Sequence, residues 1–223
     1  FETKTVIIAM GLKPRRLAIT GEEEFNGRGV SYCANCDGPF YKGKTVAVVG
    51  GGNSALDAAE VLSKMASKVY LVHRRNEFKA FEALVEEVKK KENIELILDS
   101  DIKTITGGDK VEKITVINVE SKEEKEIAVD GVFVEIGRIA HTDLVSDLVE
   151  RDERNQIIVD KSFGTKTPGI FAGGDVVAGD YKQITIAIGQ ATVAALSAYQ
   201  YLQLKSGKPE AVVYDRSIRE RNL

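Results

Sequence analysis

The 223-residue chain contains two cysteines, Cys33 and Cys36, which lie three positions apart in the stretch SYCANCDG. This spacing suits half of a zinc site, a structural disulfide, or a redox pair that opens and closes during turnover. A structural zinc site needs four ligands, and because His73 is better explained by the basic run that it begins, only His141 remains beside the two cysteines, which is too few. A structural disulfide would close only a tiny loop and is unusual in a cytosolic protein. We therefore favour the redox pair and keep the other two as alternatives.

Asp37 directly follows the second cysteine. A dithiol needs a proton donor and acceptor when a thiolate leaves as a thiol, and a neighbouring carboxyl group suits that role. The dipeptide Asp37-Gly38 is also a good turn former, so the two roles are compatible.

A glycine-rich turn follows soon after the cysteines. Gly50 and Gly52 with Ala55 fit the pattern GxGxxA between an apolar run, 45–49, and a helical pattern, 55–65. Such glycines allow a tight turn and let the backbone approach a pyrophosphate, while the helix N-terminus offers free N–H donors. The pattern predicts a dinucleotide site, with a plain tight turn as the alternative.

The end of the next apolar run, 68–72, favours one kind of dinucleotide. An NAD site usually has an acidic residue there, but this chain has His73, Arg74 and Arg75. Paired arginines can bind a 2′-phosphate, and Lys79 could add a positive charge, so we predict NADPH. The alternative is a solvated basic run. A flavin commonly joins hydride transfer to thiol exchange, and we therefore expect a flavin site as well.

The elements that must position these residues form an α/β pattern. Apolar runs predict buried strands and apolar periodicity predicts helices, whereas the alternating stretch 102–128 predicts an antiparallel insert. Residues 12–44 are expected to be mainly loop. The predicted strands are 4–10, 45–49, 68–72, 94–98, 131–137, 156–159 and 168–172, and the predicted helices are 55–65, 78–92 and 184–204, the last interrupted by Gly189.

The composition is that of an ordinary globular protein, with 43% hydrophobic and 29% charged residues. A net charge of -3 argues against a nucleic-acid binder. No apolar run approaches the roughly 20 residues of a membrane span, and there is no secretory signal. We expect a cytoplasmic protein without a metal site.

Five stretches, CANCDG, VAVVGGGNSALDAAEVL, VYLVHRR, GIFAGGDV and YKQITIAIGQATVAALSAYQYL, occur in this order. Together they resemble low-molecular-weight thioredoxin reductases over nearly the whole chain. The resemblance implies a homodimeric flavoprotein that passes electrons from NADPH through FAD and the cysteine pair to a thioredoxin or glutaredoxin-like dithiol protein. It also implies a three-layer, Rossmann-like NADPH domain, 15–139, inserted in an incomplete Rossmann-like FAD-binding domain made of 1–14 and 140–223.

The resemblance further assigns roles to individual residues. Cys36 would face the flavin, Cys33 would attack the disulfide of the partner protein, and Asp37 would be the acid and base. The residues implied for NADPH are Gly50, Gly52, Asn53 and Ser54 at the pyrophosphate, His73, Arg74, Arg75 and Lys79 at the 2′-phosphate, and Gly137 near the nicotinamide. Those implied for FAD are Gly174 and Asp175 at the ribityl chain and Lys182, Gln183 and Ile184 beside the isoalloxazine ring.

The chain departs from the family in lacking the first βαβ unit with its own glycine motif. We expect about 100 residues, roughly a small domain, to precede Phe1, so that the chain is a fragment that binds FAD poorly. One alternative is the flavoprotein of alkyl hydroperoxide reductase, although HRR argues against its NADH-using form. The others are a ferredoxin-type reductase, against which the cysteines argue, and a non-catalytic NADPH-binding fragment.

Overall fold

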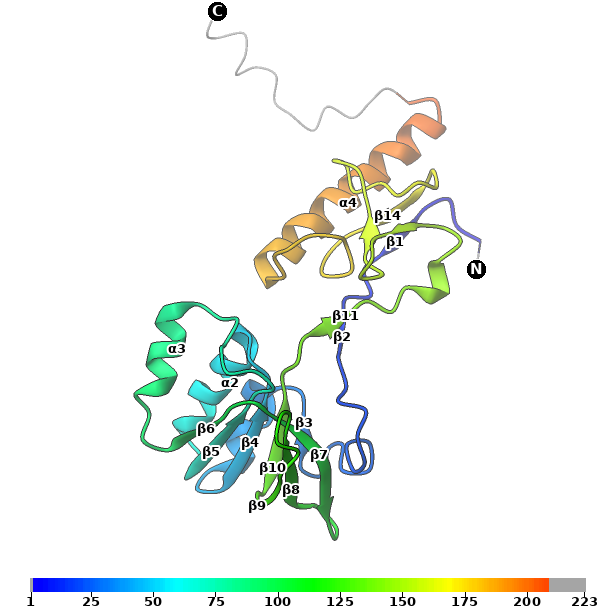
Figure 1. Cartoon of the computed structure of the whole chain (residues 1–223). Helices are drawn as coiled ribbons and strands as arrows, with labels where there is room; N and C mark the ends of the chain where they lie inside the picture. Colours follow the sequence, from blue (N-terminus) through cyan, green and yellow to red (C-terminus); the bar gives the residue numbers. More distant parts are fainter. Residues whose placement is uncertain (1, 209–223) are drawn as a thin grey trace, which may run out of the picture. The chain divides into compact units, whose positions relative to one another are not determined.

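The computed structural model describes residues 2–208 and divides the chain into two compact units (Figure 1). One unit consists of Phe1–Lys13 and Ile139–Leu223, and the other is Pro14–Arg138. We call them the split unit and the inserted unit. Their boundaries differ by one residue from those predicted, while the cofactor of each unit remains a prediction. Residues 209–223 of the predicted segment 140–223 lie outside the described residues.

The inserted unit is built on a parallel sheet of five strands. Their order across the sheet is β3 (Val30–Ser31), β10 (Gly131–Val134), β4 (Thr45–Val49), β5 (Lys68–Val72) and β6 (Ile94–Ile97). Two helices, α2 (Asn53–Ser63) and α3 (Glu82–Lys89), connect β4 to β5 and β5 to β6. In this unit the predicted strands 45–49 and 68–72 are confirmed with their bounds, and 94–98 and 131–137 form the shorter β6 and β10. Parallel strands covered on both faces need apolar side chains throughout. The predicted buried strand 4–10, in the other unit, is only three residues long and leaves Val6 and Ile7 exposed.

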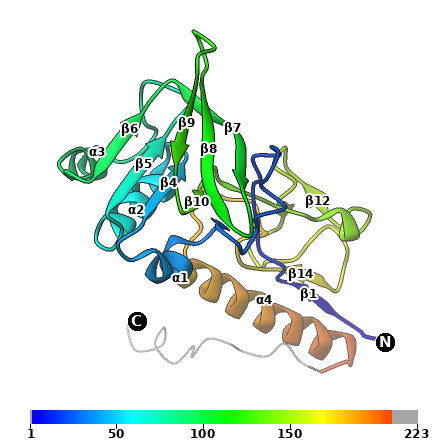
Figure 2. The same ribbon diagram turned by 90° about the horizontal axis from the view of Figure 1, so that it is seen from below.

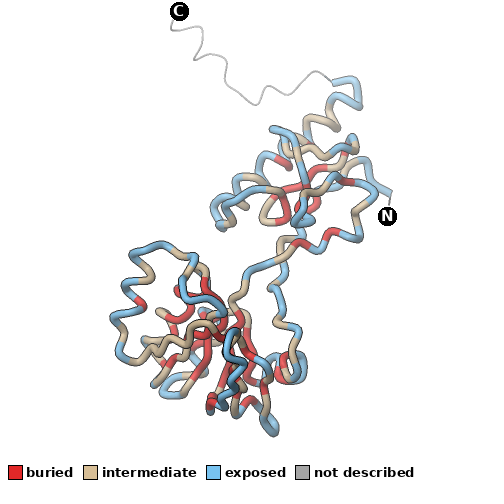
Figure 3. The backbone as a smooth tube through the Cα atoms, viewed as in Figure 1, coloured by how far each residue is buried: buried red, intermediate tan, exposed pale blue. Residues whose placement is uncertain are grey.

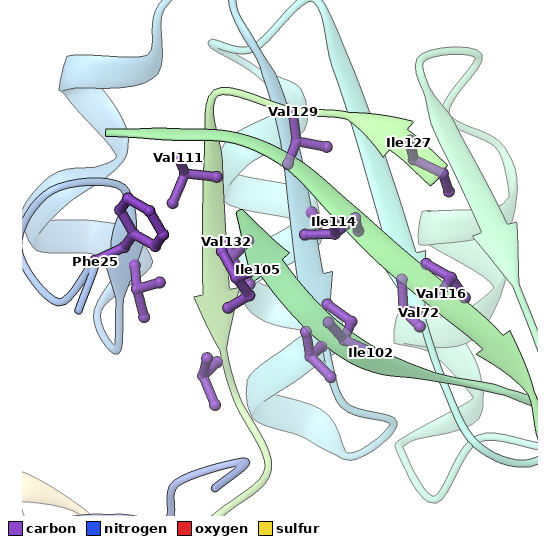
Figure 4. Close-up of a cluster of buried hydrophobic side chains, with 14 residues drawn as sticks. Phe25, Val72, Ile102, Ile105, Val111, Ile114, Val116, Ile127, Val129 and Val132 are labelled. Carbon is purple, nitrogen blue, oxygen red and sulfur yellow. The ribbon is translucent and has the colours of Figure 1, made fainter. Parts of the chain in front are cut away.

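Alternating residues of β4 enter two separate cores. Val46 and Val48 pack toward α2 and α3, whereas Ala47 and Val49 pack toward a second, antiparallel sheet. That sheet contains β7 (Ser100–Gly107), β8 (Val111–Asn118) and β9 (Glu124–Ala128), as the alternating stretch predicted. Figure 4 shows its inward side chains, among them Ile105 and Ile114, meeting residues of the parallel sheet. Helices, parallel sheet and antiparallel sheet make three layers.

The stretch 12–44 contains more structure than the predicted loop. It holds β2 (Lys13–Pro14), β3, α1 (Ala34–Asp37) and a 3-10 helix over Gly38–Tyr41. Strand β2 pairs with β11 (Arg138–Ile139), where the chain crosses between units. These elements are two to four residues long, which is too short to show a hydrophobic period.

Helix α3 is shorter than the predicted 78–92 because the residues before it are extended. Lys79 forms a bridge to Gly52, and Phe81 has β-type dihedral angles as the N-cap. The glycine turn therefore holds 79–81 in an extended form that cannot join the helix.

The split unit has less regular structure. Strand β1 (Val6–Ile8) runs parallel to β14 (Ile170–Ala172), and β12 (Glu150–Arg151) pairs with β13 (Ile157–Ile158). Helix α4 (Ile184–Lys205) lies along β1 and β14 (Figure 2) and is continuous through Gly189, contrary to the prediction. A short 3-10 helix covers Asp143–Val145. None of the helices in residues 2–208 has both the length and the apolar character of a membrane span.

Candidate nucleotide and dithiol sites

A cavity of about 760 Å³ opens at the carboxyl ends of β4, β5 and β10. This position is where open parallel sheets bind ligands, and the volume suits a small-molecule site. The cavity brings together predicted residues from three separate parts of the sequence. All nine cofactor residues predicted in the inserted unit line it: Gly50, Gly52, Asn53, Ser54, His73, Arg74, Arg75, Lys79 and Gly137.

The three glycines of the turn have different surroundings. Gly50 has a φ of +145°, and a Cβ there would lie 2.3 Å from the Glu135 carbonyl oxygen. A Cβ on Gly51 would lie 2.2 Å from the His73 ring, whereas one on Gly52 would meet nothing closer than 3.8 Å. Gly52 is also the N-cap of α2 and has no side-chain capping bond. A side chain at either of the first two glycines would collide with the surrounding fold. Gly52, in contrast, leaves the N-terminus of α2 accessible to an anionic ligand.

The residues after β5 are fixed by local contacts. The His73 ring stacks on Phe78 with ring centroids 5.5 Å apart, and its Nε2 lies 3.1 Å from the Glu77 carbonyl oxygen. Burial lowers the pKa of His73, with further lowering by Arg75 and Arg74. The Lys79 N–H donates to the Gly51 carbonyl at 2.7 Å, which ties this segment to the glycine turn.

Several cavity residues were missed from the sequence. Arg15 and Arg16 enter the cavity from the segment after β2, and Arg16 pairs with Glu23. The signal that could have found them is a second arginine pair beside the crossover between units. Together with Arg74, Arg75 and Lys79 they give the cavity five cations against two acids, Asp101 and Glu135. Such a lining attracts a polyanion.

The cysteine pair is present as a disulfide with a Cα–Cα distance of 5.3 Å. Cys33 is half-buried and is the N-cap of α1, where its Sγ accepts the Cys36 N–H at 3.2 Å. Cys36 is exposed. Ala34, between them, packs into the core below α2. Cys36 is therefore the more exposed residue of the pair, and Ala34 anchors the short helix that carries it.

A buried serine links the predicted acid to the disulfide. Ser31 Oγ donates to Asp37 Oδ2 at 2.6 Å, and the Cys33 N–H donates to the same Ser31 Oγ at 3.1 Å. Ser31 is only 5% exposed, whereas Asp37 and Cys33 are partly exposed. The sequence indicated Asp37 but not Ser31, because the two-residue strand that positions Ser31 shows no pattern in the sequence.

The predicted flavin residues all lie in the split unit, around the N-terminal end of α4. Gly174 has a φ of +81° and donates its N–H to Gln190 Oε1 of this helix at 3.1 Å. Lys182 donates to the Val177 carbonyl, and burial lowers its pKa against the opposing charge of Asp175. The remaining two, Gln183 and Ile184, are exposed at the start of the helix, where Gln183 is an N-cap without a side-chain bond. The structure thus brings the two predicted stretches of this unit together.

A dinucleotide-type cavity and a disulfide in one unit define a nucleotide-linked disulfide oxidoreductase as the class. Residues 1–191 match the family described as pyridine nucleotide-disulphide oxidoreductase, and the chain belongs to this family.

Individual relatives show which members of this family the chain resembles. The structure is similar to thioredoxin reductase from Lactococcus lactis, with a TM-score of 0.82 and 42% identity, covering 91% of this chain and 67% of that one. The sequence is 41% identical to an NADH dehydrogenase of Bacillus subtilis over 90% of this chain and 40% of that protein. It is 40% identical to an alkyl hydroperoxide reductase component of Pseudomonas putida over 90% of this chain and 39% of that protein. The chain thus spans about two fifths of the length of these two relatives.

Proposed function

We propose that the chain acts in a thioredoxin-disulfide reductase, which passes electrons from NADPH through FAD and the Cys33–Cys36 pair to a thioredoxin-like protein. The observation that supports this most is the presence of a disulfide with its acid, Asp37, in the same compact unit as a cation-lined dinucleotide cavity. The similarity to a thioredoxin reductase structure favours the same function. A homodimer and a cytoplasmic location belong to this proposal.

In the proposed reductase the cavity binds NADPH. The glycine turn and the first turn of α2 receive the pyrophosphate, since Gly52 leaves the helix N-terminus open. Arg74 and Arg75, both exposed at the rim, bind the 2′-phosphate. Gly137, with its φ of +98° and open surroundings, leaves room at the nicotinamide end.

The split unit supplies part of the flavin site. A bound flavin would take up the hydride and deliver two electrons to the disulfide. Asp175 offers an acceptor for a ribityl hydroxyl, and the start of α4 offers a positive dipole end. The left-handed Gly174 keeps the backbone of this turn close to α4. These features fit one side of a flavin.

The dithiol chemistry is assigned to the chain's own residues. The Cys33 thiolate attacks the partner's disulfide, forming a mixed disulfide and releasing one partner thiolate. The Cys36 thiolate then attacks Cys33 Sγ, which restores the Cys33–Cys36 disulfide and releases the second partner thiolate. Asp37 provides the proton that a departing thiolate needs, from a position fixed by Ser31.

The alternative with support is the flavoprotein of alkyl hydroperoxide reductase, because a protein of that enzyme is 40% identical over 90% of the chain. The basic run after β5 favours NADPH and so favours the thioredoxin reductase. A chain that binds NADPH, stays colourless after incubation with FAD and reduces no disulfide would instead be a non-catalytic NADPH-binding fragment.

The first test separates the dithiol from the flavin. With FAD and NADPH supplied, Cys36→Ser should abolish disulfide reduction of a thioredoxin-like protein while NADPH-dependent flavin reduction continues. The matched control is Asn35→Ser, which introduces the same side chain at the exposed neighbouring position and should retain both reactions. Full disulfide reduction by Cys36→Ser would exclude the proposed dithiol step.

The second test concerns nucleotide choice. Replacing Arg74 and Arg75 with Ala should raise the Kd for NADPH at least tenfold, since each charged hydrogen bond contributes about 1.5–3 kcal/mol. The Kd for NADH, which lacks the 2′-phosphate, should change little. Equal effects on the two nucleotides would contradict the 2′-phosphate assignment.

A further inference from the structure

Glu135 is one of the residues that line the nucleotide cavity, and neither the sequence prediction nor the proposed function gives it a role. It directly follows β10, and its N–H donates to the Val49 carbonyl of β4 at 2.9 Å. Its carbonyl oxygen faces Gly50 so closely that a Cβ on this glycine would lie 2.3 Å away. Glu135 therefore stands directly beside the turn that receives the pyrophosphate in the proposed function, and its side chain is half-buried in the cavity lining.

A negatively charged carboxylate at this position would repel the anionic dinucleotide that the cavity suits. Burial raises the pKa of Glu135 to about 7, and the charge of Arg138 opposes this shift without cancelling it. The other charged or titratable groups that line the cavity are Arg15 and Arg16 after β2, His73, Arg74, Arg75 and Lys79 after β5, and Asp101 of β7. Arg16 already pairs with Glu23, and the two arginines after β5 are exposed at the rim.

We propose that Glu135 is a proton-binding residue of the nucleotide site, so that the dinucleotide is bound together with a proton and its affinity falls as the pH rises. This role deepens the nucleotide binding proposed above and rests on it.

The direction of this pH dependence follows from electrostatics. A pyrophosphate beside the glycine turn brings negative charge close to Glu135, and like charge disfavours the ionised form of a carboxyl group. The neutral carboxyl group also gains an O–H that can donate to a phosphate oxygen. Because the group is about half-protonated near pH 7 in the free protein, the ligand draws in a proton at and above that pH.

Calorimetric titration of the full chain with NADPH tests this proposal. Measurements at pH 7.5 in HEPES and in Tris, which differ in ionisation enthalpy, report the number of protons bound with each ligand. We expect an uptake of about half a proton that depends on Glu135, and a Kd that rises severalfold between pH 7 and pH 9, at most about tenfold per pH unit. Glu135→Gln should lose this uptake and flatten the Kd profile, because an amide does not titrate.

A matched control is Asp101→Asn, which removes the other acid of the cavity lining. It should keep the Glu135-dependent uptake. Burial lowers the pKa of His73 and the charge of Asp101 opposes this shift, so this variant also reports how much of the uptake belongs to His73, while the 2′-phosphate contributes equally in all variants. The same uptake in Glu135→Gln as in the unmodified chain would overturn the proposal, and so would a Kd for the unmodified chain that is constant from pH 7 to pH 9. Failure of the unmodified chain to bind NADPH would overturn the proposed function and, with it, this inference.

Discussion

The two units cover their parallel sheets to different extents (Figure 3). In the inserted unit, Val46 and Leu71 are fully buried because helices lie on one face of the sheet and the antiparallel sheet on the other. In the split unit, Val6 of β1 is 43% exposed, and Ala194 and Ala198 are the only buried residues of the 22-residue helix α4. Apolar strands thus lie between helices and an antiparallel sheet in one unit, and between α4 and the short segments around β12 and β13 in the other.

The glycine turns of the two units also differ, in the groups that a side chain there would meet. Gly51 is needed because a side chain would strike the His73 ring, which faces the cavity. At Gly173 a Cβ would come within 3.2 Å of the Ala191 backbone in α4, so the helix would have to shift by a few tenths of an ångström. One turn therefore serves an open binding surface, while the other serves close packing of a helix on a strand.

The largest expected effect tests the difference in burial. Leu71→Ala should lower the free energy of unfolding of the inserted unit by about 2–5 kcal/mol, because it leaves a cavity between the layers. Leu196→Ala, at a position of α4 that is 44% exposed, should cost less than about 1 kcal/mol. Denaturant unfolding followed by circular dichroism measures both. Equal losses would show that this face of α4 is covered in solution.

The next largest effect tests the turns. Gly51→Ala should displace the His73 ring and weaken NADPH binding about tenfold or more, because the neighbouring arginines move with it. Gly173→Ala should strain the contact between β14 and α4 but leave the Kd for NADPH unchanged. Fluorescence titration with NADPH distinguishes them. A weaker NADPH affinity in Gly173→Ala would contradict the separation of roles.

A smaller effect concerns the dithiol of the well-covered unit. Ser31→Ala removes the hydroxyl that joins Asp37 to the Cys33 N–H, and one such bond is worth about 0.5–1.5 kcal/mol. The rate at which dithiothreitol reduces the disulfide should therefore change severalfold. Ser63→Ala, which removes a hydroxyl bonded to the Glu60 carbonyl at the far end of α2, is the control. Unchanged kinetics in Ser31→Ala would show that this serine does not position Asp37.

The smallest effect is a pH dependence of stability in the inserted unit. Glu135 has a pKa of about 7 in the folded chain and 4.5 as an unperturbed group. Its contribution to stability is therefore complete below pH 4.5 and is lost as the pH rises through 7. After discounting for its partial exposure, Glu135→Gln should stabilise the unit by about 1 kcal/mol at pH 8 and by nothing at pH 4. Equal effects at both pH values would contradict the raised pKa.

Long elements were predictable from the sequence because each shows a continuous apolar run or a regular apolar period. The runs 45–49 and 68–72 became β4 and β5 with unchanged bounds, and the alternating stretch became the antiparallel sheet. Strand β3 and helix α1 were missed, because two and four residues show no period and are held by neighbouring elements. The start of α3 was misplaced because its preceding residues pair with the glycine turn, which is distant in sequence.

The sequence by itself determined the chemistry on offer: a cysteine pair with an adjacent acid, a glycine turn between a strand and a helix, and a basic run one strand later. These features depend on residue type and short spacing. Only the tertiary structure decided that Arg15, Arg16 and Glu135 share the cavity with this turn, and that Ser31 joins Asp37 to Cys33. The physical reason is that the order of strands in a sheet is not their order along the chain. Strand β10 lies beside β4 in the sheet, although more than 80 residues separate them, and it delivers a carboxyl group that no local pattern could place.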